Sequence, residues 1–279
     1  MAKGDTPASQ RRTPASGYDV AIVGLGHAGL STALDCYAAG RTVVGIDVSA
    51  DRLITIGAGL ADLTDSDRER LKAALADDRF QMTADLRVLA RARSVAICVP
   101  TPIDEYFAPD AAPLKEACEA VVENAQPGQL LMLTSTTYVG CTDDLLVRPL
   151  TTRGMEVGTD VFVAFSTERI DPDPKVAQHK PTPRVVGGAT AACAERAIEA
   201  LQGCGMTVYE VPSLTIAEMA KLLENTFRAV DIAIASDFAD ICRSMNLDIT
   251  DVIDAASPVL SPSSSPTYSR GLGDARHAA

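Results

Sequence analysis

Short apolar runs alternate with amphipathic helical stretches as far as about residue 212. Runs rich in Val, Ile and Leu predict strands at 18–24, 42–47, 94–100, 129–135, 161–166, 184–188 and 206–211. Helical stretches lie between them at 28–40, 49–59, 113–125 and 191–205. Continuously apolar strands that alternate with helices are typical of a parallel sheet covered on both faces. The sequence therefore predicts an α/β, doubly wound domain of the Rossmann type over 18–212.

The pattern changes after Pro212. A single helical stretch, 213–245, runs on without Gly or Pro, and its apolar residues cover more than one narrow stripe. We expect this helix to be buried on several sides and to lead into a second domain. A shorter helix, 250–256, begins that layer. Residues 213–257 are therefore predicted to be a long connecting helix and part of a helical middle domain.

Both ends of the chain are polar. Residues 1–17 lack the apolar segment of a signal peptide, so we expect a disordered tail. Residues 258–279 are rich in Ser and Pro and then lose any apolar period, which predicts a second tail that packs no core. No run approaches the roughly 18 apolar residues of a membrane span, so we expect no membrane partner.

Composition narrows the function classes. The formal net charge is −12 and only 4% of the residues are aromatic, so neither charge attraction nor base stacking favours nucleic acid as a partner. The seven cysteines are scattered, without a CxxC pair or a cluster with His. They are typical of buried thiols in a reducing cytoplasm, and they predict no metal site.

A glycine motif follows the first predicted strand and opens a helix. Gly24, Gly26 and Gly29 give the spacing that permits a tight turn, close approach of a pyrophosphate, and close packing of helix on strand. Asp47 ends the next strand, where a carboxylate accepts ribose hydroxyls and repels the extra phosphate of NADP. The motif therefore favours NAD. Arg52 lies where it could reach the adenosine end of the cofactor, although a solvated arginine fits the sequence equally well.

Polar side chains also follow three later strands. Thr101 and Thr136 each come after an apolar run, at the sheet edge where ligands of open α/β sheets bind. Glu168, Arg169 and Asp171 come after another. Hydroxyl clusters are common in turns, and the charged group could be a surface ion cluster. At the carboxyl edge of the sheet, the same residues become candidates for acid–base chemistry or substrate contact.

The long predicted helix carries a lysine and an asparagine on one face. Lys221 and Asn225 are four residues apart, so they lie one turn from each other. A partly buried lysine can hold a water or stabilise developing negative charge. A lysine that only extends its ammonium group from the edge of the apolar face is the alternative.

Several segments together resemble one enzyme family. They are "VAIVGLGHAGL", "CVPTP", "STTYVG", "FSTERIDP", "TPRVVGG" and "AEMAKLLENTFRAVDIA". In this order they resemble the nucleotide-sugar 6-dehydrogenases, the UDP-glucose/GDP-mannose dehydrogenase family, from residue 18 to about 256. The "STTY" and "ERIDP" forms are most similar to the branch that oxidises UDP-N-acetylglucosamine or a related UDP-N-acetylhexosamine.

The resemblance implies a reaction and a set of residues. Such enzymes oxidise the C6 alcohol of a UDP-sugar to the uronic acid with two NAD, by way of a cysteine thiohemiacetal, and feed polysaccharide biosynthesis. The residues that match the family's NAD site are Gly24, Gly26, Gly29, Asp47, Arg52, Thr101 and Thr136. Those that match its catalytic groups are Thr136, Glu168, Lys221 and Asn225.

The chain also departs from the family pattern. Thr167 stands where the family usually has Pro, so the backbone before Glu168 could differ. The catalytic cysteine of a "GGHC"-type loop is missing, and no cysteine follows Cys242. We therefore expect a chain cut short before its UDP-binding domain, with 258–279 as out-of-frame translation. Such a chain would bind NAD and show little or no turnover.

Two other interpretations remain open at this point. A complete β-hydroxyacid dehydrogenase would also place a glycine motif before a long helix with Lys221 and Asn225, and it would need no cysteine. A non-catalytic NAD-binding module would use the apolar face of 213–245 to dimerise. We expect a homodimer through that helix under the family interpretation as well.

Overall fold

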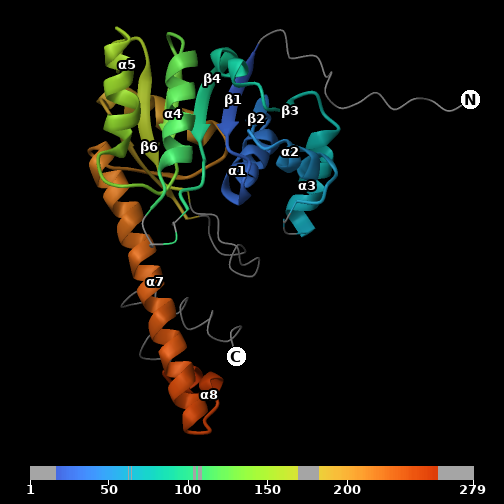
Figure 1. Cartoon of the computed structure of the whole chain (residues 1–279), viewed down its shortest axis with the longest axis vertical. Coiled ribbons are helices and arrows are strands. Elements are labelled where there is room, and N and C mark those ends of the chain that lie inside the picture. Colours follow the sequence, from blue (N-terminus) through green and yellow to red (C-terminus); the bar gives the residue numbers. More distant parts are fainter. Residues whose placement is uncertain are drawn as a thin grey trace, which may run out of the picture. The chain divides into compact units, whose positions relative to one another are not determined.

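The computed structural model describes residues 17–61, 63, 65–102, 105, 109–168 and 182–256 (Figure 1). The chain divides into two compact units, Met1–Met219 and Ala220–Ala279. Each unit is described by itself below. The tails expected at 1–17 and 258–279 lie outside the described residues, apart from Gly17.

An eight-stranded sheet forms the centre of the first unit. The strands are β1 (Tyr18–Val23), β2 (Val43–Ile46), β3 (Phe80–Thr83), β4 (Ala92–Ile97), β5 (Leu130–Leu133), β6 (Phe162–Ser166), β7 (Arg184–Gly188) and β8 (Val208–Glu210). Their order is β3-β2-β1-β4-β5-β6-β7-β8, and every neighbouring pair is parallel except β6 and β7. The order reverses between β1 and β4, which is where open α/β sheets bind their ligands.

Helices connect these strands. They are α1 (His27–Ala38), α2 (Ala50–Gly57), α3 (Asp65–Leu75), η2 (Leu86–Arg91), α4 (Ala112–Asn124), η3 (Asp143–Val147), α5 (Arg148–Thr152) and α6 (Ala191–Gly203). The long helix α7 (Leu214–Ser244) belongs to the first unit only as far as Met219, and α8 (Ile249–Ala256) lies in the second. The doubly wound α/β architecture predicted from the sequence is confirmed.

The strands are apolar on both faces because helices cover both. Val20 and Ile22 of β1 pack into one cluster with residues of α1, α3 and α6. Leu114 and Val121 of α4 are buried outside that cluster, and α4 contacts β4. Alternate residues of a strand point to opposite faces, so a strand between two helical layers needs no polar face. This is why the parallel strands appear in the sequence as unbroken apolar runs.

The sheet differs from the expectation in two places. β3 was not predicted, because Phe80 is its only buried residue and its remaining positions are half-buried. β7 runs antiparallel to β6, with Ser166 opposite Val186, whereas the sequence favoured a parallel sheet throughout. The antiparallel pair places the start of β7 at the same edge as the end of β6. That arrangement matters for the site described below.

The second unit contains the rest of α7 and α8. Ala235 and Cys242 of α7 pack against Ile249 and Ile253 of α8 in a small cluster. Among the described residues, none of the helices has the length and apolar character needed to cross a membrane.

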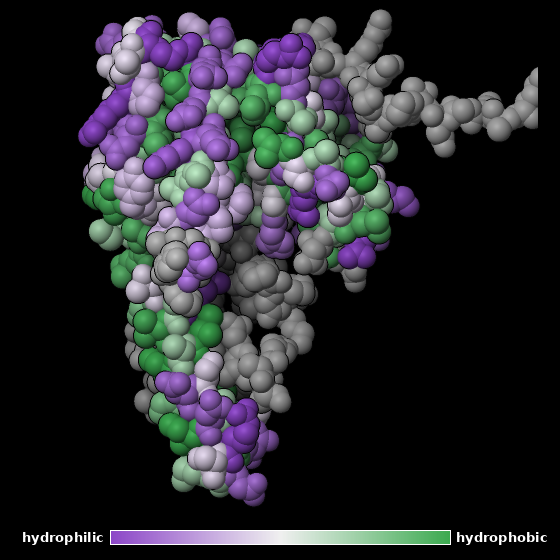
Figure 2. All heavy atoms as spheres, viewed as in Figure 1, coloured by the Kyte–Doolittle hydropathy of each residue, from purple (hydrophilic) through white to green (hydrophobic). Residues whose placement is uncertain are grey.

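Most apolar side chains of α7 are exposed, which corrects the expectation that the helix is buried on several sides. The exposed residues are Ile216, Met219, Leu223, Phe227, Val230, Ile232, Ile234, Phe238 and Ile241. Figure 2 shows hydrophobic side chains at the surface of this helix. A 31-residue helix has more lateral surface than one short partner helix can cover, so the single chain leaves an apolar stripe in solvent.

The first turns of α7 are fixed within the first unit by a buried carboxylate. Glu218 is 1% exposed and accepts hydrogen bonds from the backbone N–H groups of Gly140 (2.6 Å) and Thr142 (2.9 Å). The Thr142 hydroxyl donates a third bond at 2.6 Å. These N–H groups lie at the amino end of the helical segment that continues into η3 and α5, where a negative charge is favourable.

Replacing Glu218 with alanine should leave two buried N–H groups without an acceptor. We expect the free energy of unfolding of Glu218→Ala, measured by urea denaturation, to fall by about 3 kcal/mol. Glu116→Ala on the exposed side of α4 is the matched control and should change stability by less than about 0.5 kcal/mol. Equal stability of the two variants would show that the buried carboxylate does not anchor α7.

Candidate functional site

The glycine loop after β1 has no room for side chains at two of its three glycines. Gly24 has φ +89°, and a Cβ there would lie 2.8 Å from the Cys98 carbonyl oxygen. A Cβ on Gly29 would lie 1.9 Å from the Gly24 carbonyl oxygen. The loop therefore presses against β4 on one side while α1 presses against the loop on the other. Only glycine permits both approaches.

The third glycine borders open space. A Cβ on Gly26 would meet no atom within 4 Å, so the fold does not require glycine at this position. Gly26 directly precedes α1, whose free N–H groups and dipole favour a phosphate. Open space at the amino end of this helix is what a pyrophosphate needs, so the residues present fit a dinucleotide.

Asp47 and Arg52 are both tied to the glycine loop. The Asp47 carboxylate accepts hydrogen bonds from the backbone N–H groups of Leu25 (2.9 Å) and Ser49 (2.9 Å). Arg52 donates from Nε to the Leu25 carbonyl oxygen at 2.8 Å. Ser49 caps α2, since its side chain accepts a hydrogen bond from the Arg52 N–H. The structure thus brings Asp47 and Arg52 to the loop, with the carboxylate half-buried.

The strand-end hydroxyl groups connect two neighbouring strands. Thr101 follows β4, and its hydroxyl donates to the Thr136 carbonyl oxygen after β5 at 2.9 Å. Ser135 donates to the Val99 carbonyl oxygen at 2.7 Å. These bonds hold the two strand ends together at the edge that bears the glycine loop. The structure therefore brings together Thr101 and Thr136, as the sequence predicted.

Glu168 follows β6 at the same edge and is buried rather than part of a surface ion cluster. It is 8% exposed and pairs with Arg184 of β7, Nη2 to Oε1, at 3.3 Å. Arg184 also donates to the Thr32 hydroxyl of α1 at 3.0 Å. Because Thr32 and Gly29 lie on the same helix, this arginine links the carboxylate to the element that begins at the glycine loop. Arg169 and Asp171, the other members of the expected cluster, lie outside the described residues.

Arg184 was not predicted from the sequence as a site residue. It lies in "TPRVVGG", where an arginine directly before an apolar strand is usually a solvated strand end. Arg184 reaches Glu168 because β7 runs antiparallel to β6, and no pattern in the sequence predicted that direction. The arginine is 6% exposed, and within the described residues its Nη1 atom has no hydrogen-bond partner. A buried guanidinium of this kind needs its carboxylate partner, so it fixes where Glu168 can lie.

Cys98 lies between the glycine loop and the strand-end hydroxyl groups. Its thiol is 3.0 Å from the Thr134 hydroxyl. Burial raises the pKa of Cys98 to about 11, so the group stays protonated at neutral pH. All seven cysteines are buried, as predicted from the sequence.

Lys221 and Asn225 lie in the second unit, one turn apart on α7. Lys221 is half-buried and Asn225 is exposed. Glu168 and Thr136 belong to the first unit. No group of His, Cys, Asp and Glu side chains among the described residues could hold a metal ion.

Fold and site together define a dinucleotide-binding oxidoreductase domain with the acidic residue that suits NAD. The NAD binding domain of the UDP-glucose/GDP-mannose dehydrogenase family matches residues 18–202, and the central domain of that family matches residues 215–271. The chain belongs to the UDP-glucose/GDP-mannose dehydrogenase family. The central-domain match extends into the Ser/Pro-rich segment, beyond the described residues.

Individual relatives agree with this assignment. A UDP-N-acetyl-D-glucosamine 6-dehydrogenase from Salmonella typhi is 34% identical over 240 residues, which are 85% of this chain and 55% of that protein. The solved UDP-D-ManNAc dehydrogenase of Pyrococcus horikoshii is 30% identical with a TM-score of 0.75, over 85% of this chain and 57% of that one. This chain therefore spans little more than half the length of these relatives.

A third comparison concerns the β-hydroxyacid dehydrogenase interpretation. A 3-hydroxyisobutyrate dehydrogenase from Salmonella typhimurium gives a TM-score of 0.62 at 17% identity, over 93% of this chain and 77% of that one. At this identity the likeness shows the fold alone. The family assignment therefore rests on the nucleotide-sugar dehydrogenase matches.

The glycine loop predicts opposite results for two similar substitutions. Gly26→Ala should fold with an unchanged melting temperature, because its Cβ enters open space, but should bind NAD at least about tenfold more weakly. Gly29→Ala should unfold at a lower temperature, because its Cβ collides with the Gly24 carbonyl group. Thermal unfolding and calorimetric titration with NAD separate the two effects. Normal NAD affinity in Gly26→Ala would show that the pyrophosphate does not use this space.

Proposed function

We propose that this chain is the NAD-binding portion of a dehydrogenase that oxidises the C6 alcohol of a UDP-sugar to the uronic acid, with UDP-N-acetylhexosamine favoured over UDP-glucose. One observation carries the proposal. The residues after β1, β4, β5 and β6 lie at one edge of the sheet and supply a glycine loop, two linked threonines and a buried glutamate. The relatives named for UDP-N-acetylhexosamines support the substrate class.

Binding of NAD falls to the glycine loop and β2. The α1 amino end and the open space at Gly26 suit the pyrophosphate, and the Asp47 carboxylate suits the ribose hydroxyls. When bound, NAD supplies the hydride acceptor for each of the two oxidation steps. Thr101 and Arg52 hold the surrounding loops in place through their own hydrogen bonds.

The sugar alcohol must lose a proton as it is oxidised, and four residues are assigned to that task. Thr136 and Glu168, which both belong to the first unit, are assigned to the reacting carbon of the sugar. Glu168 assists the acid–base chemistry there. Lys221 and Asn225, which both lie on α7, would bind the reacting oxygen and a water. A lysine ammonium stabilises the negative charge that develops on the alcohol oxygen. Arg184 would keep the Glu168 carboxylate in position through their buried ion pair.

The second oxidation needs a reactive thiol in this family's mechanism. The seven cysteines of the sequence are all buried, and none matches the family's catalytic position. We therefore propose that the 279-residue polypeptide, assayed by itself, binds NAD but makes little or no uronic acid.

Cofactor choice and turnover test this proposal directly. The chain should bind NAD more tightly than NADP by calorimetry, and Asp47→Asn should lower NAD affinity about tenfold (~1.4 kcal/mol) because the ribose loses its charged acceptor. Asp51→Asn, on the exposed first turn of the neighbouring α2, is the matched control and should bind NAD normally.

NADH formation with UDP-N-acetylglucosamine, UDP-glucose and a panel of 3-hydroxy acids completes the experiment. Binding of NAD without turnover agrees with the proposal. Turnover of a 3-hydroxy acid would overturn it in favour of a β-hydroxyacid dehydrogenase. Two NADH per UDP-sugar would show that the buried thiols or another chain provide the second step.

We further propose that α7 pairs with α7 of a second copy. Exposed apolar residues recur along it with an 11-residue period, as in Ile216, Phe227 and Phe238, or in Leu223 and Ile234. Eleven residues make nearly three whole turns, so the stripe runs straight along one side of the helix. A stripe of this length in solvent favours burial against an equal partner.

A charge placed in this stripe should oppose pairing. Phe238→Glu should raise the dimer dissociation constant by about 100-fold (~2.7 kcal/mol), because dimerisation must then bury a carboxylate. Ser236→Glu places the same charge on another side of α7 and serves as control. Sedimentation or native mass spectrometry over a range of concentrations measures the effect. A wild-type chain that stays monomeric at all concentrations would refute the pairing.

A further inference from the structure

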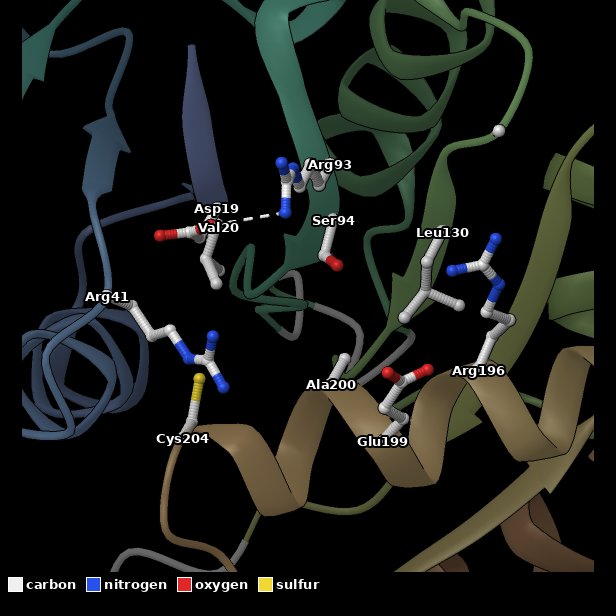
Figure 3. Close-up of a pocket in the computed structure, with 11 residues that line it drawn as sticks. Asp19, Val20, Arg41, Arg93, Ser94, Leu130, Arg196, Glu199, Ala200 and Cys204 are labelled. Carbon is white, nitrogen blue, oxygen red and sulfur yellow. Dashed lines mark ion pairs between the residues drawn. The ribbon is translucent and has the colours of Figure 1, made fainter. Parts of the chain in front are cut away.

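A cavity of about 370 Å³ lies at the edge of the sheet opposite the glycine loop. Asp19, Ser94 and Leu130 line it from the amino-terminal parts of β1, β4 and β5, and Glu199 and Cys204 line it from the end of α6 and the residue that follows (Figure 3). The proposed reaction with NAD and UDP-sugar does not use this edge.

Three guanidinium groups surround the cavity in an otherwise acidic protein. Arg41 and Arg196 approach from opposite sides and Arg93 from the strand side (Figure 3). Arg41 donates from Nε to the Gly203 carbonyl oxygen at 2.8 Å, which caps the end of α6. Arg196 lies over the ring of Phe162 at 4.8 Å, an arrangement that keeps its charge.

Two carboxylates, Asp19 and Glu199, also line the cavity, so they offset only part of the charge of the three arginines. Arg93 lies 4.0 Å from Asp19, and its side chain is 83% exposed. Asp19 is further bound by the Thr42 backbone N–H and hydroxyl, so its carboxylate is already satisfied. The cavity therefore presents guanidinium donors to a ligand with carboxylate groups.

Two thiols lie together beside these arginines. Cys204 lines the cavity, and its thiol lies close enough to that of Cys36, near the end of α1, for each to shift the pKa of the other. Both side chains belong to the cluster that α1 and α6 form on the sheet. The pair therefore joins the carboxyl ends of two helices that are far apart in the sequence, with one sulfur facing the cavity and the other behind it.

The surroundings make Cys204 the more acidic thiol of the pair. Interaction with the Cys36 thiol lowers the pKa of Cys204, burial opposes this shift, and the positive charges of Arg41 and Arg184 lower the pKa further. The same interaction, with burial, raises the pKa of Cys36. Cys204 also lines the cavity, whereas Cys36 does not, so Cys204 is the thiol that a bound ligand meets first.

We propose that this cavity is a thiol–disulfide exchange site, in which Cys204 reacts with a small disulfide that carries carboxylates, of the glutathione disulfide class. Cys36 completes the reaction as the resolving thiol. The arginines bind the carboxylates, and the cavity admits the half of the small disulfide that becomes attached.

The exchange balances in two steps. The Cys204 thiolate attacks one sulfur of the small disulfide, whose S–S bond breaks, and the first small thiol leaves and takes a proton from water. Cys36 then loses its proton to solvent and attacks the Cys204 sulfur, so that the mixed disulfide breaks and the second small thiol leaves. The protein thiols lose the two electrons that the small disulfide gains, and a Cys36–Cys204 disulfide remains.

Peptide mass spectrometry of the folded chain after incubation with excess glutathione disulfide tests the site. The wild type should lose two thiols and carry a Cys36–Cys204 disulfide. Cys36→Ser should stop with a glutathionyl group on Cys204, and Cys204→Ser should gain nothing at either position. Cys118 is the internal control, because burial raises its pKa to about 12 and it should remain a thiol.

A separate experiment tests whether the arginine charges attract the carboxylates of the disulfide. Arg93→Gln should slow the reaction with glutathione disulfide by about threefold and leave the reaction with uncharged hydroxyethyl disulfide unchanged. Equal slowing with both reagents would overturn the role of the arginines.

Other results would overturn the exchange site itself. They are modification of Cys118 or Cys98 before Cys204, no modification of Cys204 in Cys36→Ser, or a wild-type adduct that never resolves to the Cys36–Cys204 disulfide. Circular dichroism confirms that each serine variant is folded. Should one fail to fold, the map of the wild-type chain decides, since it either contains this disulfide or does not.

Discussion

The close approach of α1 to β1 is the constraint on which the first unit depends. Gly29 lies so near the Gly24 carbonyl group that a single added carbon would collide with it, and Gly24 in turn lies against Cys98 of the neighbouring strand. This contact sets the direction of α1, leaves its amino end open at Gly26, and brings Asp47 to the loop through the Leu25 N–H. The cofactor site is therefore a consequence of backbone packing before any ligand is present.

The same helix extends the constraint along this edge of the sheet to Glu168. Thr32 of α1 accepts a hydrogen bond from Arg184, and Arg184 pairs with Glu168 after β6. A buried carboxylate without such a partner would be costly, so this ion pair both permits and positions Glu168. The buried Glu218 carboxylate instead accepts hydrogen bonds from N–H groups at a helix terminus. In both cases a carboxylate is buried only where donors already point at it.

The two edges of the sheet offer different chemistry. The carboxyl edge collects loops, because parallel strands all end there, and it holds the glycine loop, Asp47, Thr101, Thr136 and Glu168. The amino edge holds helix ends, and there Cys36 and Cys204 meet beside Arg41. Arg184 connects the two edges, because it pairs with Glu168 and its positive charge also lowers the pKa of Cys204.

The sequence by itself determined the α/β class, the glycine loop, the unbroken helix α7 and the buried state of the cysteines. Each follows from local spacing or from an apolar run, which the chain carries in its order of residues. Only the tertiary structure decided that β7 returns antiparallel, that Arg184 thereby reaches Glu168, that Cys36 meets Cys204, and that the apolar stripe of α7 is exposed. These depend on which distant segments become neighbours. A pattern of spacing shows that a side chain must be buried or paired, but long-range packing alone supplies the partner.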